Sequence, residues 1–374
     1  MNVARIPWRW EISFTTPDST SNANPPQVPV GNAWTQRNDV GYVAAWDVTV
    51  RNSAGATVPG RAYVNNLAMN MGGPSATLSS QVWLQTRDGF RYRVDVNGAQ
   101  PFGFHLFANN KGFTDAFGLP LYRSVDMAGS RFHDPDLADT PTDVTHKIFF
   151  NSPALDLPSS APTPTGSTWL LTTPFVATVS NFRFVGVDGT TGQAASGIGG
   201  TFSFQSTGVG NFVVRIDLDA DGNFSGPVDR ALVGVAAVGT NSIPWDGLDG
   251  LGRRASPSGD PSNVFARVTL LGGEVHFPYI DAENNTNGIV IERQTGAGAP
   301  DYTVFHDDRA VGGTASLPPT GENSQNGGHK WSNFLGDVRG MDTWAFVPGA
   351  TLELETEVVI RDADLELVSR SCKS

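Results

Sequence analysis

The sequence predicts an all-β protein, with two or three β-sandwich domains in tandem and long loops between strands. Short runs of β-branched and aromatic residues alternate with turn sequences at intervals of roughly 8–12 residues. Gly and Pro are abundant, with 42 and 25 residues in a chain of 374, and this composition is typical of turn-rich β structure. No stretch of about 12 residues shows the periodicity of an amphipathic helix.

Residues 1–151 are predicted to form an N-terminal β-sandwich domain. The turn Arg87-Asp88-Gly89 separates two alternating runs, and Asp-Gly in this position is a strong signal for a β-hairpin. The strands expected here are Tyr42–Val50, Arg61–Val64, Gln81–Thr86, Phe90–Val96, Phe102–Phe107 and Lys147–Phe150. The spacing of their turns favours a sandwich of the jelly-roll or Ig-like kind.

Residues 152–174 are rich in Pro, Ser and Thr, which predicts a stiff linker. A second, Ig-like sandwich is expected at residues 175–293. Its predicted strands are Phe182–Val187, Thr201–Gln205, Phe212–Leu218, Ala231–Ala237, Asn263–Leu271 and Gly288–Glu292. Residues 294–374 are expected to form a C-terminal β region that packs on the first domain and leads into a further repeat. In its Thr351–Ile360 segment, alternating apolar and Glu residues predict a half-buried edge strand with an acidic outer face.

The charge pattern argues against nucleic-acid binding, because the net charge is −12 and phosphate binding needs a basic surface. No cluster of Lys and Arg and no apolar run of about 18 residues is present, so membrane insertion is not expected. The chain shows no signal peptide, and a secreted protein would therefore have lost its leader. The single cysteine, Cys372, allows no internal disulfide, and we interpret it as an ordinary residue near the chain end.

The strongest candidate site is the acidic turn that begins at Asp217. Carboxylates alternate at Asp217, Asp219 and Asp221, and Gly222 allows a sharp turn directly after them. Calcium takes six to eight oxygen ligands, and this spacing brings carboxylate oxygens to one point. Asn223 and Asp229 complete the predicted set of calcium ligands. Because Val228 stands where an EF-hand has its Glu and the flanks are expected to be strands, the predicted role of calcium is to stiffen a β-module.

Residues of about 200–272 resemble the Ig-like domain of the flagellar hook-capping protein and related modules of secreted bacterial proteins. The matching residues are Trp245, Asp246, Gly247, Asp249, Gly252, Pro257 and Gly259. The resemblance implies that Trp245 packs at the edge of a sandwich and that Asp246 and Asp249 cap tight turns. It implies no catalytic role.

Other segments resemble the head region of large bacterial cell-surface proteins that carry arrays of Ig-like repeats. These segments are Asp88–Val94, Phe107–Phe113, Gly273–Asn285 and Gly336–Trp344. The ending Ala363–Leu367 resembles the start of such a repeat. This resemblance implies an adhesive or structural role. Within the Gly273–Asn285 segment, Glu274 and His276 are expected on one face of a strand, and Asp281, Glu283 and Asn285 offer a second oxygen-rich loop, for which a solvated strand end is the favoured interpretation.

Catalytic motifs are lacking. The six His residues are scattered, and no His-Glu-x-x-His or Gly-x-Ser-x-Gly pattern occurs. His306-Asp307-Asp308 is interpreted as a solvated turn at a strand end. Lys147, which precedes apolar residues, is the best candidate for an intramolecular isopeptide bond, although an exposed Lys at a strand end is the favoured interpretation.

The sequence therefore predicts a non-enzymatic, extracellular, structural or adhesive protein of the bacterial cell surface, stiffened by Ca²⁺. Its expected partners are a protein or glycan at a cell surface, or further copies of itself. Two alternatives remain open: a self-assembling subunit of an extracellular filament or surface layer, and a lectin-like head that binds carbohydrate. Trp83, Tyr92 and Phe104 have the spacing for sugar-stacking on a sheet, although they are interpreted as core residues.

Overall fold

The computed structural model describes residues 48–70, 77–128, 131–163, 166–175, 177–224, 226–258, 264–318, 320–347 and 352–362. The described part is built almost wholly from β-strands, which confirms the all-β prediction. Its helical segments are the two short 3₁₀ turns η2 (Arg309–Val311) and η3 (Ser324–Asn326). Among the described residues, no helix has the length and hydropathy that a membrane span requires.

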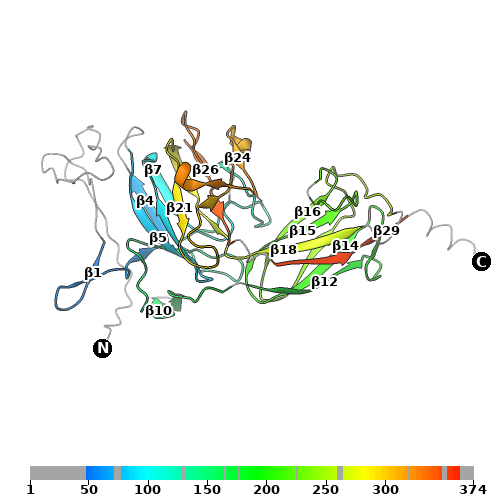
Figure 1. Ribbon diagram of the computed structural model, residues 1–374, viewed down its shortest axis with the longest axis horizontal. Helices are drawn as coiled ribbons and strands as arrows, with labels where there is room; N and C mark the ends of the chain where they lie inside the picture. Colours follow the sequence, from blue (N-terminus) through cyan, green and yellow to red (C-terminus); the bar gives the residue numbers. More distant parts are fainter. Residues whose placement is uncertain are drawn as a thin grey trace, which may run out of the picture. The chain divides into compact units, whose positions relative to one another are not determined.

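The chain divides into two compact units, and each contains residues from two separate segments (Figure 1). Unit 1 comprises residues 1–175 and 275–345, and unit 2 comprises residues 176–274 and 346–374. This division differs from the predicted boundaries in two places. Residues 275–293 belong to unit 1, and the region 294–374 is shared between the units.

Unit 1 contains two five-stranded sheets. The strand order of the first is β4 (Asn66–Asn70), β7 (Gln100–Phe107), β20 (Tyr279–Asn284), β26 (Arg339–Met341) and β8 (Val125–Asp126). The order of the second is β21 (Val290–Arg293), β6 (Arg91–Asp95), β5 (Gln81–Gln85), β9 (Lys147–Phe149) and β3 (Tyr63–Val64). Each sheet therefore includes strands from both segments of the unit.

Short strand pairs complete unit 1. They are β1 (Val50–Arg51) with β2 (Thr57–Val58), β10 (Ser160–Thr163) with β11 (Gly166–Trp169), β19 (Val275–His276) with β27 (Trp344–Ala345), β22 (Thr303–Val304) with β25 (Glu322–Asn323), and β23 (His306–Asp307) with β24 (Ala315–Ser316). Most of the predicted strand Tyr42–Val50 lies outside the described residues. The predicted hairpin at Arg87-Asp88-Gly89 is present between β5 and β6, and Gly89 has a φ of 95° that favours glycine.

The segment interpreted as a stiff linker contains a β-hairpin. Strands β10 and β11 pair antiparallel, with Pro162 opposite Ser167. Proline is tolerated here because a two-stranded sheet consists only of edge strands, so a missing N–H need not break a ladder.

Unit 2 contains a three-stranded and a four-stranded sheet. The first has the order β12 (Val179–Gly186), β14 (Gly200–Ser206) and β17 (Gly239–Trp245). The second has the order β16 (Arg230–Ala236), β15 (Gly210–Asp217), β18 (Phe265–Leu271) and β28 (Leu352–Glu357). A parallel pair, β13 (Gln193–Ala195) with β29 (Val359–Arg361), completes the unit.

Both sheets of unit 2 contribute to one hydrophobic core. Phe202 and Phe204 of β14 belong to the same buried cluster as Val214 of β15 and Val268 of β18. Buried and exposed positions alternate along β14, as the period of two in a strand requires. Strand β28 lies at the edge of its sheet with Glu355 and Glu357 exposed, in agreement with the prediction for this segment.

The residues after β17 form tight turns around Trp245. The Trp245 ring is buried and lies 5.9 Å from the Phe184 ring. Asp246 Oδ1 accepts the Leu248 N–H at 3.0 Å, and Asp249 Oδ1 accepts the Leu251 N–H at 2.9 Å. These contacts are those of an anchoring aromatic residue and two turn caps. Gly259 and Cys372 lie outside the described residues.

Gly247 and Gly252 give a matched test of this packing, because both have a φ of 76°. A Cβ at Gly247 would lie 2.6 Å from the backbone nitrogens of Gly199 and Ile198, whereas a Cβ at Gly252 would meet no atom within 4 Å. We expect Gly252→Ala to lower the free energy of unfolding by about 1 kcal/mol through its left-handed backbone. Gly247→Ala should cost about 1–3 kcal/mol more through the clash. Denaturant unfolding of both variants measures the difference, and equal losses would contradict this packing.

Candidate functional site

Three groups of His, Asp and Glu side chains in the described residues have ligand atoms close enough to hold one metal ion. They are Asp217, Asp219 and Asp221 in unit 2, and Asp281, Glu283 and Asp337 and then His306, Asp308 and His329 in unit 1. Within each group the candidate ligand atoms lie within 4.8 Å of one another. The first is the predicted calcium turn, the second overlaps the predicted oxygen-rich loop, and the third was not predicted.

The predicted calcium turn begins at the last residue of β15. Asp217 is buried, and its carboxylate accepts the backbone N–H groups of Asp221 at 3.2 Å and Gly222 at 2.9 Å. Ala220 and Gly222 have φ values of 57° and 80°, which fold the chain back toward Asp217. Asp219 and Asp221 are exposed at the surface of the turn.

The structure brings Asp229 to the same turn. Its carboxylate is buried and accepts the N–H groups of Leu218 at 3.0 Å and Gly226 at 2.7 Å. A Cβ placed on Gly226 would lie 3.1 Å from Asp229 Oδ2 and 3.6 Å from Asp219 Oδ2, so both carboxylates flank this glycine. The remaining predicted ligand, Asn223, is exposed and donates its backbone N–H to Asp221 Oδ1 at 2.7 Å.

The turn gathers negative charge without a cationic side chain. Among the described residues, no Lys or Arg forms an ion pair with Asp217, Asp219, Asp221 or Asp229. Burial raises the pKa of Asp217, and the charges of Asp229 and Asp219 raise it further, against the hydrogen bonds from Gly222 and Asp221. A bound divalent cation would relieve this repulsion.

The second group differs from the predicted loop in its third member. Asp337, more than fifty positions further along the chain, lies beside Asp281 and Glu283 in place of Asn285. The side-chain amide of Asn285 instead donates to the carbonyl of His329 at 3.0 Å. Both Glu283 oxygens accept the Phe102 N–H, at 2.9 and 2.7 Å. Burial raises the pKa of Glu283, and the charges of Asp281 and Asp337 add to this effect. Backbone hydrogen bonds thus already use the buried carboxylate of this group.

Glu274 and His276 do not share a site. Glu274 accepts a hydrogen bond from Asn211 at 2.7 Å within unit 2. His276 belongs to unit 1, where its Nδ1 lies 2.7 Å from Asp342 Oδ2 and both side chains are fully buried. The chain passes from one unit to the other between these two residues, which is why strand periodicity alone misplaced them.

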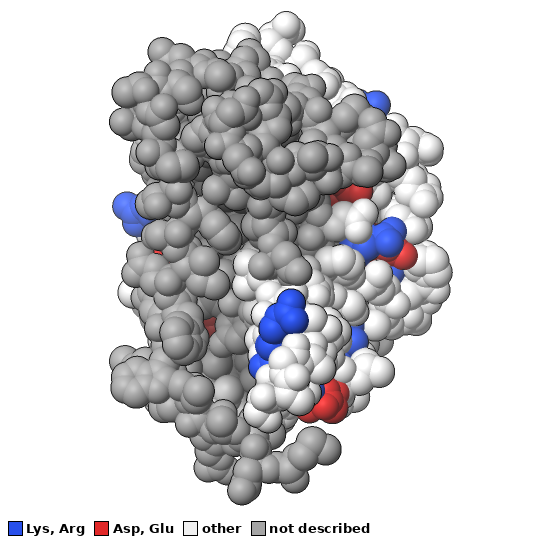
Figure 2. All heavy atoms as spheres, turned by 90° about the vertical axis from the view of Figure 1, so that its left-hand side faces the viewer, with Lys and Arg blue, Asp and Glu red and all other residues white. Residues whose placement is uncertain are grey.

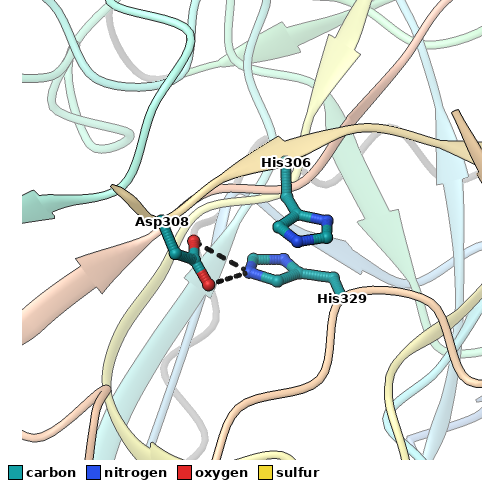
Figure 3. A group of neighbouring side chains, drawn as sticks. All are labelled: His306, Asp308 and His329. Carbon is teal, nitrogen blue, oxygen red and sulfur yellow. Dashed lines mark hydrogen bonds and ion pairs between the residues drawn. The ribbon is translucent and has the colours of Figure 1, made fainter. Parts of the chain in front are cut away.

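The third group contradicts the interpretation of His306–Asp308 as a solvated turn. His306 and Asp308 have exposed fractions of only 3% and 1%, and His329, which lies beside them, is 1% exposed. The rings of His306 and His329 are stacked, with centroids 4.3 Å apart and planes 6° apart. Figure 3 shows the two rings one above the other, with the Asp308 carboxylate directed at the edge of His329.

Hydrogen bonds hold Asp308 and His329 in place. Both Asp308 oxygens lie 3.1 Å from His329 Nε2, and the Ser124 hydroxyl donates to Asp308 Oδ1 at 2.6 Å. His329 Nδ1 is in contact with the Thr343 hydroxyl. Burial alone would raise the pKa of Asp308, but the charge and hydrogen bond of His329 hold it below its usual value. Burial lowers the pKa of His329, against the charge and hydrogen bond of Asp308.

Only one signal in the sequence pointed to this group, namely the spacing of His306 and Asp308. Ser124, His329 and Thr343 reach it from distant parts of the chain, and no local pattern marks them. Comparison of the chain with protein-family models, curated proteins and solved structures found no match.

The isopeptide candidate, Lys147, is buried and not exposed at a strand end. Its ammonium donates a hydrogen bond to Thr168 Oγ1 at 2.9 Å and lies 4.6 and 4.5 Å from the ring centroids of Tyr63 and Trp169. Burial lowers the pKa of Lys147 to about 8, although the charge of Asp139 opposes this shift. The ammonium is thus held by an aromatic cage and one hydroxyl.

The buried ammonium makes stability depend on pH. Between a folded pKa of about 8 and the usual value of about 10.4, the unfolded chain binds more protons, so the free energy of unfolding should rise with pH across this window. Lys147→Met should remove this rise, whereas Lys330→Met, which changes an exposed lysine, should keep it. Denaturant unfolding at several pH values measures both slopes. Parallel slopes for the wild type and Lys147→Met would contradict the shift.

Proposed function

We propose that the chain is a non-enzymatic, extracellular protein of the bacterial cell surface, with a structural or adhesive role, and that Ca²⁺ stiffens its second unit. The observation that carries the proposal is the turn between β15 and β16, where four carboxylates meet without a cationic partner. The proposed ligands are oxygens of Asp217, Asp219, Asp221 and Asp229, with Asn223 at the rim. Ca²⁺ prefers such oxygen ligands and accepts irregular geometry.

We further propose that unit 2 is an Ig-like β-sandwich. The shared core of its two sheets supports this assignment, since packed sheets bury their inner faces against each other. The turns around Trp245 support the resemblance to the Ig-like domain of the hook-capping protein. For unit 1, with two five-stranded sheets, we propose a larger sandwich.

A calcium ion in this position would act on the framework of unit 2. Strand β15, which ends at Asp217, pairs with both β16 and β18. An ion bound by Asp217 and Asp229 would join the end of β15 to the start of β16 and would hold the intervening loop. The expected result is a unit that resists unfolding, which suits a protein that carries load outside the cell.

The proposed partners are a protein or glycan at a cell surface, or further copies of the chain. On the face in Figure 2, Lys and Arg side chains stand beside Asp and Glu side chains in the part that belongs to described residues. The net charge of −12 favours partners other than nucleic acid. Of the aromatic residues considered for sugar stacking, Tyr92 and Phe104 are buried and Trp83 is half-buried, so only Trp83 of the three has surface for the lectin-like alternative.

Thermal unfolding in calcium and in chelator tests the proposal. An ion that binds only the folded state at 100 times its dissociation constant adds about 2.7 kcal/mol, which corresponds to a rise of about 10 °C in the Tm of unit 2. Asp217→Asn should abolish most of this rise, because it removes a charge from the buried centre of the turn. A Tm that is the same in calcium and in chelator would refute the calcium site.

Asp188→Asn is the matched control for this experiment. Asp188 is an exposed carboxylate of unit 2 that pairs with Arg361 and lies outside the acidic turn. Its variant should therefore keep the full calcium-dependent rise in Tm. Size-exclusion chromatography of the same samples distinguishes a monomer from a self-assembling subunit, and a glycan array tests the lectin-like alternative.

A further inference from the structure

The buried group of His306, Asp308 and His329 differs in chemistry from the acidic turn, because two of its three members offer nitrogen. Ca²⁺ takes oxygen ligands, whereas imidazole nitrogen together with carboxylate oxygen suits Zn²⁺ and related divalent transition metals. All three side chains are at least 97% buried, with exposed fractions of 3%, 1% and 1%. The group lies wholly within unit 1.

The spacing of the ligand atoms fits a shared ion. His329 Nε2 lies 3.1 Å from both Asp308 oxygens, and a ring nitrogen of His306 lies within 4.8 Å of the other ligand atoms. With metal–ligand bonds of about 2.0–2.2 Å, neighbouring ligand atoms on one zinc ion lie about 3–3.5 Å apart. The pair of Asp308 and His329 already has this separation.

Each side chain of the group also has an outer partner that orients it. The Nδ1 atom of His306 lies 3.1 Å from Glu322 Oε1, and the Nδ1 atom of His329 is in contact with the Thr343 hydroxyl. The Ser124 hydroxyl donates to Asp308. Metal-binding histidines commonly hold one ring nitrogen on a carboxylate, carbonyl or hydroxyl group while the other faces the metal. In His329 the other nitrogen, Nε2, faces the Asp308 carboxylate.

His306 is the least satisfied member of the group. Its Nδ1 lies 3.1 Å from Glu322 Oε1 but outside hydrogen-bond geometry. Its Nε2 lies 3.4 Å from the hydroxyl of the exposed Thr314. The Nε2 of His306 is therefore held less firmly than that of His329, which faces both Asp308 oxygens.

We propose that His306, Asp308 and His329 form a binding site for a divalent transition-metal ion of the zinc type. The metal-binding atoms are Nε2 of both histidines and the Asp308 carboxylate, with Glu322, Thr343 and Ser124 as orienting partners. The Asp308 carboxylate supplies negative charge that the ion compensates.

Binding requires one local movement. The in-plane lone pairs of two stacked rings lie in separate, nearly parallel planes, so the two Nε2 atoms cannot both point at one ion in the stacked arrangement. His329 is hydrogen-bonded at both nitrogens, whereas the Nε2 of His306 has only a 3.4 Å contact with Thr314. His306 therefore tilts toward Asp308 when the ion binds, and the stack opens.

Zinc(II) titration of the full chain, prepared without a histidine tag and stripped with chelator, tests the site. Calcium is present in excess so that the acidic turn is saturated, and binding is followed by calorimetry. We expect one tight equivalent of zinc. Thr343→Val should weaken it by about 10- to 100-fold, as is typical of an orienting partner, and Asp308→Asn and His306→Gln by at least that factor.

The matched controls are His105→Gln, which changes an exposed histidine of β7, and Asp188→Asn, which changes an exposed carboxylate outside both proposed metal sites. Both should keep the wild-type zinc affinity. Near-ultraviolet circular dichroism confirms that each variant folds. Because a variant of a buried residue can fail this check, ¹⁵N NMR of the wild-type histidines gives a second measurement. The Nε2 resonances of His306 and His329 should shift together as one equivalent binds.

The proposal is overturned if the stripped protein takes up no tight equivalent of zinc, or if folded Asp308→Asn binds zinc as strongly as the wild type. It is also overturned if zinc binds without moving the resonances of His306 and His329. None of these results depends on the calcium turn, so the two metal sites are tested separately.

Discussion

The pairing of β7 with β20 is the interaction on which the architecture of unit 1 depends. Tyr279 lies opposite Leu106 and Ile280 opposite His105, so strands more than 170 residues apart in sequence are direct neighbours. Strand β20 then pairs with β26 on its other side. Without this pairing, β26 and β8 would have no connection to the rest of the sheet. Unit 1 is therefore complete only after the chain has passed through unit 2 and returned.

The buried group of His306, Asp308 and His329 also depends on the joining of the two segments of unit 1. The N–H of Asp342 donates to Ser124 Oγ at 3.0 Å, and the Ser124 hydroxyl in turn donates to Asp308. Ser124 belongs to the first segment of unit 1, whereas Asp308 and Asp342 belong to its second segment. One hydroxyl thus joins the two segments of the unit at the group. When distant strands pair, the chain loses the entropy of a long loop before stabilising contacts form. Unit 1 is therefore predicted to fold slowly.

The features that the sequence predicted correctly are those that local chemistry determines. The hairpin of β5 and β6 follows from alternation and one Asp-Gly turn, and β14, β15 and β16 follow from short β-branched runs. The acidic turn was found because its first three carboxylates lie within five residues, and Asp229 lies close behind. The structure places Asp229 beside these residues, and its contact with Leu218 explains why.

The features that the sequence missed depend on distant segments. The periodicity of a strand and the chemistry of its turns show which residues form strands but not which strands pair. The crossing into unit 1 at residue 275 and the return of residues 346–374 to unit 2 therefore had no local signal. His306 and Asp308 were interpreted as solvated because a short polar run at a strand end is normally exposed. They are buried because His329, from a later loop, stacks on His306 and contacts Asp308. The Trp331 ring lies 4.7 Å from the His329 ring in turn. The Pro-rich segment was interpreted as a linker because composition does not show that its two halves pair.

The two proposed metal sites differ in how much the protein must change to bind an ion. In the acidic turn, backbone N–H groups already hold the buried carboxylates of Asp217 and Asp229. A site that is formed before binding adds stability without a conformational change, because binding orders few further residues. Such a site suits an ion that stabilises the fold, and it does not suit an ion that triggers a conformational change. The group of His306, Asp308 and His329 instead requires a stacked ring to move before it can bind an ion. Occupancy of this site is therefore coupled to a change in the packing of unit 1. An ion shifts the equilibrium between the two packing arrangements only by the difference in its affinity for them.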